Sequence, residues 1–163
     1  MDALFAAVRK AERWLLVALM ILLAVFCFAQ VFWRLILQNP LAWSEEVSRY
    51  LFVWLTFIGA AAAVATRGHF LVDVVIGKLP PRPALAFRLF GYLAILFFAY
   101  IMLFHGWELL KRILNQFSPA MRLPMVIPYA ALPLSGLLMI LHLVELARAD
   151  LRESRNRNRE GRA

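Results

Sequence analysis

Residues 14–33 read WLLVALMILLAVFCFAQVFW, an uninterrupted run of 20 residues with no acidic or basic side chain. A helix that rises about 1.5 Å per residue needs roughly this length to cross a hydrocarbon core of about 30 Å. Basic residues precede the run, as in a signal peptide, but it is longer than a signal-peptide core and no small-x-small cleavage site closes it. We therefore expect a permanent transmembrane helix.

Three more uncharged runs follow, at residues 50–66, 89–107 and 123–144. Of the 163 residues, 63% are hydrophobic and 17% are charged, whereas soluble domains are about half apolar and about a quarter charged. This composition excludes a soluble globular domain, a nucleic-acid-binding domain and a disordered protein. The sequence predicts an all-α polytopic membrane protein whose four transmembrane helices lie at about residues 14–33, 47–66, 87–107 and 123–144.

The segments between these spans are too short for a second folded domain, so residues 1–154 are expected to form one membrane domain. Residues 155–163 are rich in arginine and have no apolar face, which predicts a flexible tail. Residues 69–79 place His69 and Asp73 opposite an apolar face, which is typical of a short helix lying in the membrane interface.

The distribution of basic residues predicts the topology. Of the 18 lysines and arginines, 13 lie in the N-terminal segment, the middle loop and the C-terminal tail, and 5 lie in the other two loops. The positive-inside rule therefore places both termini and residues 69–79 in the cytoplasm. Contact with anionic membrane lipids accounts for the net charge of +8, so no nucleic-acid partner is expected.

The ionisable residues point away from catalysis. Cys27 is the only cysteine, so a disulfide or a cysteine-based metal site within the chain is excluded. The acidic residues all fall in loops or at the ends of predicted helices, and His105 and His142 fall at opposite ends of their spans. We expect no catalytic site, no cofactor and no metal in this chain. Two alternatives stay open, a membrane anchor of a haem or quinone enzyme and an autonomous small multidrug exporter, which requires an acid within a span.

Small residues recur at helical spacing in the second span, with Gly59 followed by Ala63 and Ala61 followed by Ala65. This pattern allows another helix to approach closely, either within the chain's own bundle, which we favour, or from a partner protein. The last span has a second small face, at Ala131, Ser135 and Gly136. It also contains Pro133, which cannot donate a hydrogen bond to the carbonyl of Tyr129, so a kink is expected there.

Glu45 and Glu46 are adjacent acids near the start of the second helix. Neighbouring side chains on a helix point about 100° apart, so the two carboxylates do not converge on one atom and catalysis by the pair is not expected. They are interpreted either as part of a salt-bridged helix end with Arg49 or as a contact to a partner subunit.

Three stretches, taken in order, resemble the small membrane subunit (DctQ type) of tripartite ATP-independent periplasmic (TRAP) transporters. Residues 43–49 (WSEEVSR) resemble the family's W-x-E-E-x-x-R block. Residues 67–73 (RGHFLVD) are similar to its G-H-x-x-V-D segment, and residues 118–124 (SPAMRLP) resemble its S-P-A-x-R-x-P entry to the last span.

The resemblance implies a division of labour in a bacterial inner membrane. A large membrane subunit carries the substrate and sodium sites and moves as an elevator, while a periplasmic binding protein delivers an organic anion, often a carboxylate. The small subunit braces the large one, and the free basic tail suggests separate polypeptides. The residues expected at the partner interfaces are Trp43, Glu45, Glu46, Arg49, Tyr50, Gly59, Ala63, His69, Asp73, Pro119, Arg122, Pro124, Tyr129 and Gly136.

Overall fold

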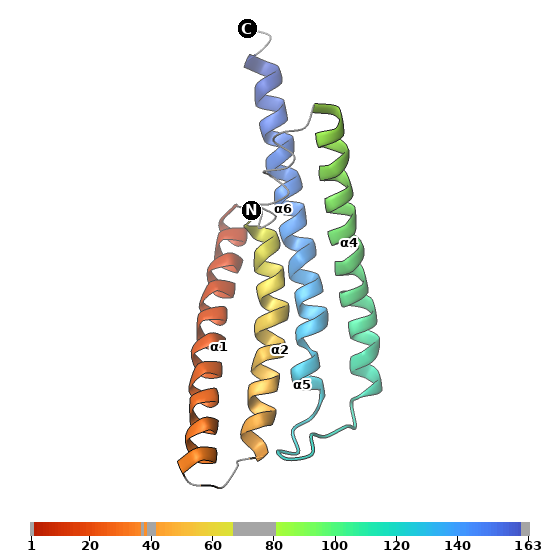
Figure 1. Ribbon diagram of the computed structural model, residues 1–163. Coiled ribbons are helices and arrows are strands. Elements are labelled where there is room, and N and C mark those ends of the chain that lie inside the picture. The colour runs from red at the N-terminus through yellow and green to blue at the C-terminus, as the bar shows by residue number, and fades with distance from the viewer. Residues whose placement is uncertain (1, 37, 39–41, 67–80, 161–163) are drawn as a thin grey trace.

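The computed structural model describes residues 2–36, 38, 42–66 and 81–160. Four long helices and one short helix make up most of the described chain (Figure 1). Their bounds are α1 (Asp2–Ile36), α2 (Ala42–Ala65), α4 (Pro81–Arg112), α5 (Val126–Tyr129) and α6 (Ala131–Glu160). The interfacial helix predicted at 69–79 lies outside the described residues.

The four predicted spans are confirmed. Segments long and apolar enough to cross a membrane occur at Ala3–Ile36, Trp43–Ala65, Leu89–Arg112 and Val126–Arg148. The helices extend beyond the uncharged runs at several ends, because amphipathic turns continue the helix past the apolar core. Helix α6 reaches Glu160, so helical structure enters the predicted tail, whose flexibility stays a prediction.

The long helices form a row rather than a closed bundle (Figure 1). Helix α1 packs on α2, α2 packs on α6, and α6 packs on α4, so α1 and α4 are the two edges. Along the helix axes, the start of α1 and the end of α6 lie at the same end of the molecule, as an even number of spans requires. In the most apolar stretch of each span, 39% of the residues are buried in the span formed by α5 and α6, but only 6% are buried in the α1 span. Most apolar side chains therefore face outward.

Close backbone contact joins α4 to α6. A Cβ atom on Gly136 would lie 2.7 Å from the backbone nitrogen of Leu103 and 2.8 Å from the carbonyl oxygen of Ala99. Real Cβ atoms do not approach backbone atoms this closely, so only glycine fits. Ala61 of α2, Ala99 of α4 and Met139 of α6 meet in the buried cluster beside this contact. The small face predicted on the last span thus packs within the chain.

Pro133, where a kink is expected, lies in the first turn of α6. Ala130, which separates α5 from α6, keeps helical angles (φ −60°, ψ −20°). Its N–H donates to the carbonyl of Val126 at 2.9 Å, and its carbonyl accepts from the N–H of Leu134 at 3.3 Å. The carbonyl of Tyr129 has no N–H to accept from Pro133, so one helical hydrogen bond is missing at this turn, and the kink stays a prediction. Helix α4 begins at Pro81, a position that proline tolerates because the first turn of a helix needs no N–H.

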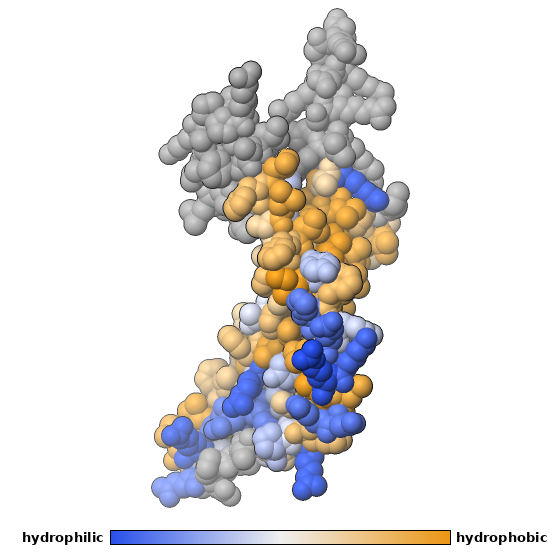
Figure 2. Space-filling view, turned by 90° about the vertical axis from the view of Figure 1, so that its right-hand side faces the viewer, coloured by the Kyte–Doolittle hydropathy of each residue, from blue (hydrophilic) through white to orange (hydrophobic). Residues whose placement is uncertain are grey.

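The surface separates by polarity. Viewed toward the α4 edge, hydrophobic residues dominate the middle of the molecule and hydrophilic residues gather toward one end (Figure 2). Helix α4 exposes a series of large apolar side chains, which includes Leu89, Phe90, Leu93, Phe97, Tyr100, Phe104 and Trp107. In a membrane protein such an apolar band faces lipid or another membrane protein.

Candidate functional site

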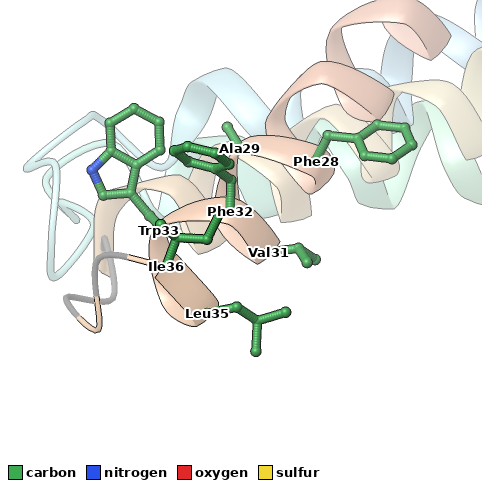
Figure 3. A pocket seen from close by; sticks show the side chains of 7 residues that line it. All are labelled: Phe28, Ala29, Val31, Phe32, Trp33, Leu35 and Ile36. Atoms are coloured by element: carbon green, nitrogen blue, oxygen red, sulfur yellow. The ribbon is translucent and has the colours of Figure 1, made fainter.

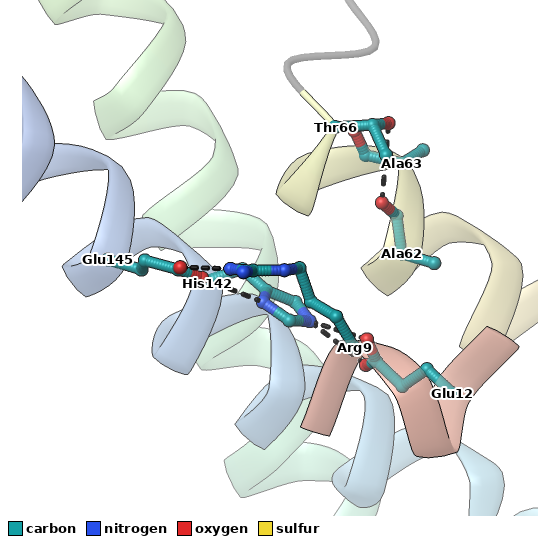
Figure 4. A network of polar contacts seen from close by, with 7 residues as sticks. All are labelled: Arg9, Glu12, Ala62, Ala63, Thr66, His142 and Glu145. Atoms are coloured by element: carbon teal, nitrogen blue, oxygen red, sulfur yellow. Dashed lines mark hydrogen bonds and ion pairs between the residues drawn. The ribbon is translucent and has the colours of Figure 1, made fainter. Parts of the chain in front are cut away.

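Two polar clusters connect the helices. They lie at opposite ends of the molecule along the helix axes, which we call the ends of the row. The first, which we call the charged clamp, consists of Arg9 and Glu12 on α1 and of His142 and Glu145 on α6 (Figure 4). The His142 side chain is fully buried. Its Nε2 lies 2.8 Å from Oε2 and 3.0 Å from Oε1 of Glu12, so one imidazole nitrogen meets both carboxylate oxygens.

The second pair of the charged clamp lies beside the first. The guanidinium of Arg9 donates to Oε1 of Glu145, and the Nδ1 of His142 lies 3.9 Å from Oε2 of Glu145. Arg148 extends the contact between α1 and α6, with its guanidinium 6.0 Å from the centre of the Phe5 ring. Helix α2 lies between α1 and α6 (Figure 1), and Figure 4 shows the charged clamp beside the end of α2.

The charged clamp corrects the prediction that every acidic residue lies in a loop or at a helix end. Glu12 is 5% exposed and lies ten residues after the first residue of α1. His142, predicted near one end of its span, has a fully buried side chain. The sequence did contain a signal, because Phe5, Glu12 and Leu19 are seven residues apart and all three are buried on the same side of α1.

The second cluster, which we call the loop clamp, joins α2 to the segment 113–125. The two oxygens of the Glu46 carboxylate accept hydrogen bonds from the backbone N–H groups of Ala120 and Met121, each at 3.0 Å. The Ser118 hydroxyl accepts a third, from the N–H of Leu123 at 3.1 Å. Glu46 and Ser118 are both buried. Two of the three family-like motifs, residues 43–49 and 118–124, therefore meet in space.

Further side chains fix the same end of the row. The indole N–H of Trp54 donates to the carbonyl of Ile127 at 3.2 Å. On the other side of α2, the amide of Gln30 donates to the carbonyl of Ser44 at 2.7 Å and to the hydroxyl of Ser48 at 2.5 Å. The rings of Phe26 and Trp43 form a T-shaped pair, with their planes nearly perpendicular and their centroids 6.1 Å apart. Helix α2 is thus bonded to both of its neighbours here.

The predicted interface residues fall into groups with different environments. Tyr50 and Gly59 are half-buried, and a Cβ on Gly59 would lie 3.8 Å from the side chain of Leu16 on α1. Glu46 and Gly136 are buried against their own chain. His69 and Asp73 lie outside the described residues. The residues with exposed side chains are Trp43, Glu45, Arg49, Ala63, Pro119, Arg122, Pro124 and Tyr129.

These environments show which small residues pack within the chain and which are exposed to lipid or a partner. Ala61 and Gly136 pack within the chain, as we favoured, and Gly59 faces α1. Ala63 points outward and remains available to lipid or a partner. Glu46 bonds backbone N–H groups of its own chain, a role that neither interpretation of the paired acids included.

An apolar hollow of about 450 Å³ lies near the end of α1 (Figure 3). All the residues that line it come from this one helix, and their side chains point away from its axis in several directions. One helix cannot enclose a small ligand, so the hollow is part of the outward apolar face of α1. Its lining residues are Phe28, Ala29, Val31, Phe32, Trp33, Leu35 and Ile36.

Comparison with known proteins gives a consistent family. The model of the DctQ component of tripartite ATP-independent periplasmic transporters matches residues 23–153. A putative TRAP transporter small permease protein of Haemophilus influenzae is 30% identical over 85% of this chain and 86% of its own length. The C4-dicarboxylate TRAP transporter small permease protein DctQ of Vibrio cholerae is 24% identical over 83% of this chain and 69% of its own length.

A third relative is much longer. The isethionate TRAP transporter permease protein DctMQ of Oleidesulfovibrio alaskensis is 32% identical over 63% of this chain but only 16% of its own length. The match of the family model over most of the chain, together with the two motifs that meet at Glu46, shows that the chain belongs to the DctQ family, the small permease subunits of TRAP transporters.

Proposed function

We propose that this chain is a fixed brace for a larger membrane subunit in the inner membrane, with both of its own termini in the cytoplasm. In this proposal the large subunit holds the substrate and sodium sites and performs the movement. A periplasmic binding protein delivers the solute, and the present chain supplies no catalytic or cofactor chemistry. The solute is an organic anion, with a carboxylate as the favoured class.

The proposal rests chiefly on how the chain uses its polar groups. The charged clamp and the loop clamp consume buried polar side chains in contacts between helices of the same chain. The outward surface of the spans is left apolar, as the exposed side chains of α1 and α4 show. A row of helices held at both ends, with apolar faces on its outside, suits a part that keeps its shape while a neighbour moves.

The relatives support the partner and the solute class. The DctMQ protein and the sialic acid TRAP transporter permease protein SiaT of Haemophilus influenzae match this chain over only 16% and 12% of their lengths. A segment like this chain is therefore part of a larger permease polypeptide in those proteins. Their names, with that of the C4-dicarboxylate protein, refer to isethionate, sialic acid and C4-dicarboxylates. All three are organic anions.

The contacts of the histidines weigh against a haem anchor. The Nε2 of His142 is held by Glu12, and the Nδ1 of His105 lies 3.5 Å from Glu108 at the other end of the row. The two imidazoles are thus at different depths, whereas bis-histidine ligation requires a facing pair. The exporter alternative requires a reachable acid, and Glu12 is 5% exposed and paired with His142.

Affinity purification from the native membrane tests the proposal. A tagged copy of this chain, solubilised in mild detergent, is expected to bring down one large multi-span membrane protein in a constant ratio. Deletion of this chain should abolish binding-protein-dependent uptake of an organic anion, and its return should restore uptake. A chain that purifies alone, with uptake unaffected by its deletion, contradicts the proposal. A Soret absorbance band in the purified chain indicates the haem alternative.

A further inference from the structure

Helix α1 is an edge helix whose long contact with the rest of the chain is almost entirely apolar. It packs on α2 through side chains such as Leu16, Leu19 and Phe26. In a membrane, apolar contacts of this kind hold two helices together but discriminate poorly between neighbouring registers, because lipid tails are as apolar as leucine. Other contacts must therefore specify the axial register of α1 against α2.

Polar contacts of α1 occur at the two ends of that apolar seam. Glu12 meets His142 of α6 at one end, and Gln30 meets Ser44 and Ser48 of α2 at the other. The two α1 residues are 18 positions apart, which is five turns at 3.6 residues per turn, so they lie on the same side of the helix. Both side chains therefore point into the seam, about 27 Å apart along the axis.

Each contact is specific to one register. A displacement by one turn moves α1 by about 5.4 Å, which separates the Glu12 carboxylate from an imidazole now 2.8 Å away. Because His142 is fully buried, the displaced imidazole would find no water to replace the carboxylate. The Arg9–Glu145 pair would separate by the same distance. Slipped registers therefore lose buried polar contacts while they keep similar apolar contact.

We propose that the charged clamp and the Gln30 contact act together as register pins, which fix the axial position of α1 on α2. Their role is to exclude the slipped registers, and apolar packing supplies most of the attraction between the helices. The register of α1 is a property of the chain alone, so this proposal stands apart from the identity of the transport partner.

Cysteine cross-linking measures the register directly. Leu16 lies against Gly59, so Leu16→Cys paired with Gly59→Cys reports the native register. Pairing Leu16→Cys with Leu55→Cys or Ala63→Cys reports displacement by one turn in either direction. Disulfides do not form when the two Cα atoms are more than about 7 Å apart, which makes the pairs selective. Cys27, which is free and exposed, is first replaced by alanine in every variant.

The decisive variant removes both pins by making them apolar, with leucine at Arg9, Glu12, Gln30, His142 and Glu145. With the pins intact, the native pair should cross-link far more than the displaced pairs. Without them, the ratio of native to displaced product should fall severalfold. An unchanged ratio in the membrane-inserted variant overturns the proposal. As a matched control, Leu19→Ala weakens apolar packing on the same face and should leave the ratio unchanged.

A second variant keeps the test valid if the apolar variant does not fold. Exchanging the two residues of the buried pair, Glu12→His with His142→Glu, retains the same two side-chain types and lets them meet in the same register. This variant should cross-link at residue 59 with the parental preference. Displaced cross-links in the exchanged variant overturn the proposal, because they show that these two groups do not determine the position of α1.

Discussion

The charged clamp and the loop clamp fasten opposite ends of the helix row by different chemistry. In the charged clamp, side chains of α1 contact side chains of α6, so the contact depends on the residue types at both positions of each pair. In the loop clamp, Glu46 accepts hydrogen bonds from backbone N–H groups, which any residue except proline supplies at positions 120 and 121. The charged clamp is therefore sensitive to substitution of either partner, whereas the loop clamp depends on the side chains of Glu46 and Ser118 and on backbone N–H groups.

Breaking one half of the charged clamp should have the largest effect. His142→Ala leaves the buried Glu12 side chain without its hydrogen-bond partner, and an unsatisfied buried polar group costs about 1–3 kcal/mol, and more when the group is charged. Unfolding by SDS titration in bicelles measures this loss. The double variant Glu12→Leu with His142→Leu removes both groups and should recover most of the stability. A double variant as unstable as the single one contradicts the pairing.

The contact between α4 and α6 belongs to neither clamp and should give the next largest effect. Gly136→Ala places a methyl group 2.7 Å from a backbone nitrogen of α4, and overpacking of this kind costs about 1–3 kcal/mol. Gly91→Ala is the matched control, because a Cβ there meets nothing within 4 Å. The same unfolding assay should show destabilisation only for the first. Equal stability of the two variants would mean that the helices are farther apart than described.

The loop clamp should respond locally. Glu46→Gln retains one acceptor oxygen and replaces the other with an NH₂ group, which cannot accept a hydrogen bond from Met121 or Ala120. Amide hydrogen exchange in residues 117–124 should accelerate severalfold, with a smaller change in the helices. Glu45→Gln alters the adjacent, exposed acid and should leave this exchange as it was. Faster exchange in both variants would indicate a general charge effect.

The smallest effect is expected at Trp54. Trp54→Phe keeps an aromatic ring but removes the N–H that bonds the carbonyl of Ile127, and a hydrogen bond contributes about 0.5–1.5 kcal/mol net. Trp43→Phe is the control, since phenylalanine preserves the edge-on contact with Phe26. A loss of stability confined to Trp54→Phe is the expected result of the unfolding assay. Indistinguishable variants would show that the indole bond contributes nothing measurable.

The spans followed from the sequence because length and hydropathy determine which segments can cross a membrane. The missing hydrogen bond at Pro133 followed from the absent N–H of proline. The order of the helices in the row did not follow from the sequence, because hydropathy indicates how deep a residue lies in the membrane but not which helices it contacts. Gly136 was correctly placed on a small face, yet only the structure shows that it faces Ala99 and Leu103.

The two clamps were harder to predict for a physical reason. Glu12 and His142 are 130 residues apart, and each by itself resembles an ordinary polar residue near the end of an apolar run. Glu46 was recognised as part of a motif, but its partners are backbone N–H groups, which leave no trace in residue identity. The better clue is that residues 43–49 and 118–124 both resemble motifs of one family, and the structure brings these two motifs into contact.

Solute uptake by reconstituted vesicles tests most directly whether the chain braces a moving partner. Vesicles that contain this chain alone should show no uptake of an organic anion under a sodium gradient. Vesicles with this chain, the large subunit and the loaded binding protein should accumulate the anion, and the His142→Ala variant should lower that uptake. Vectorial uptake by the chain alone would contradict the account, because it would place the transport site within these helices.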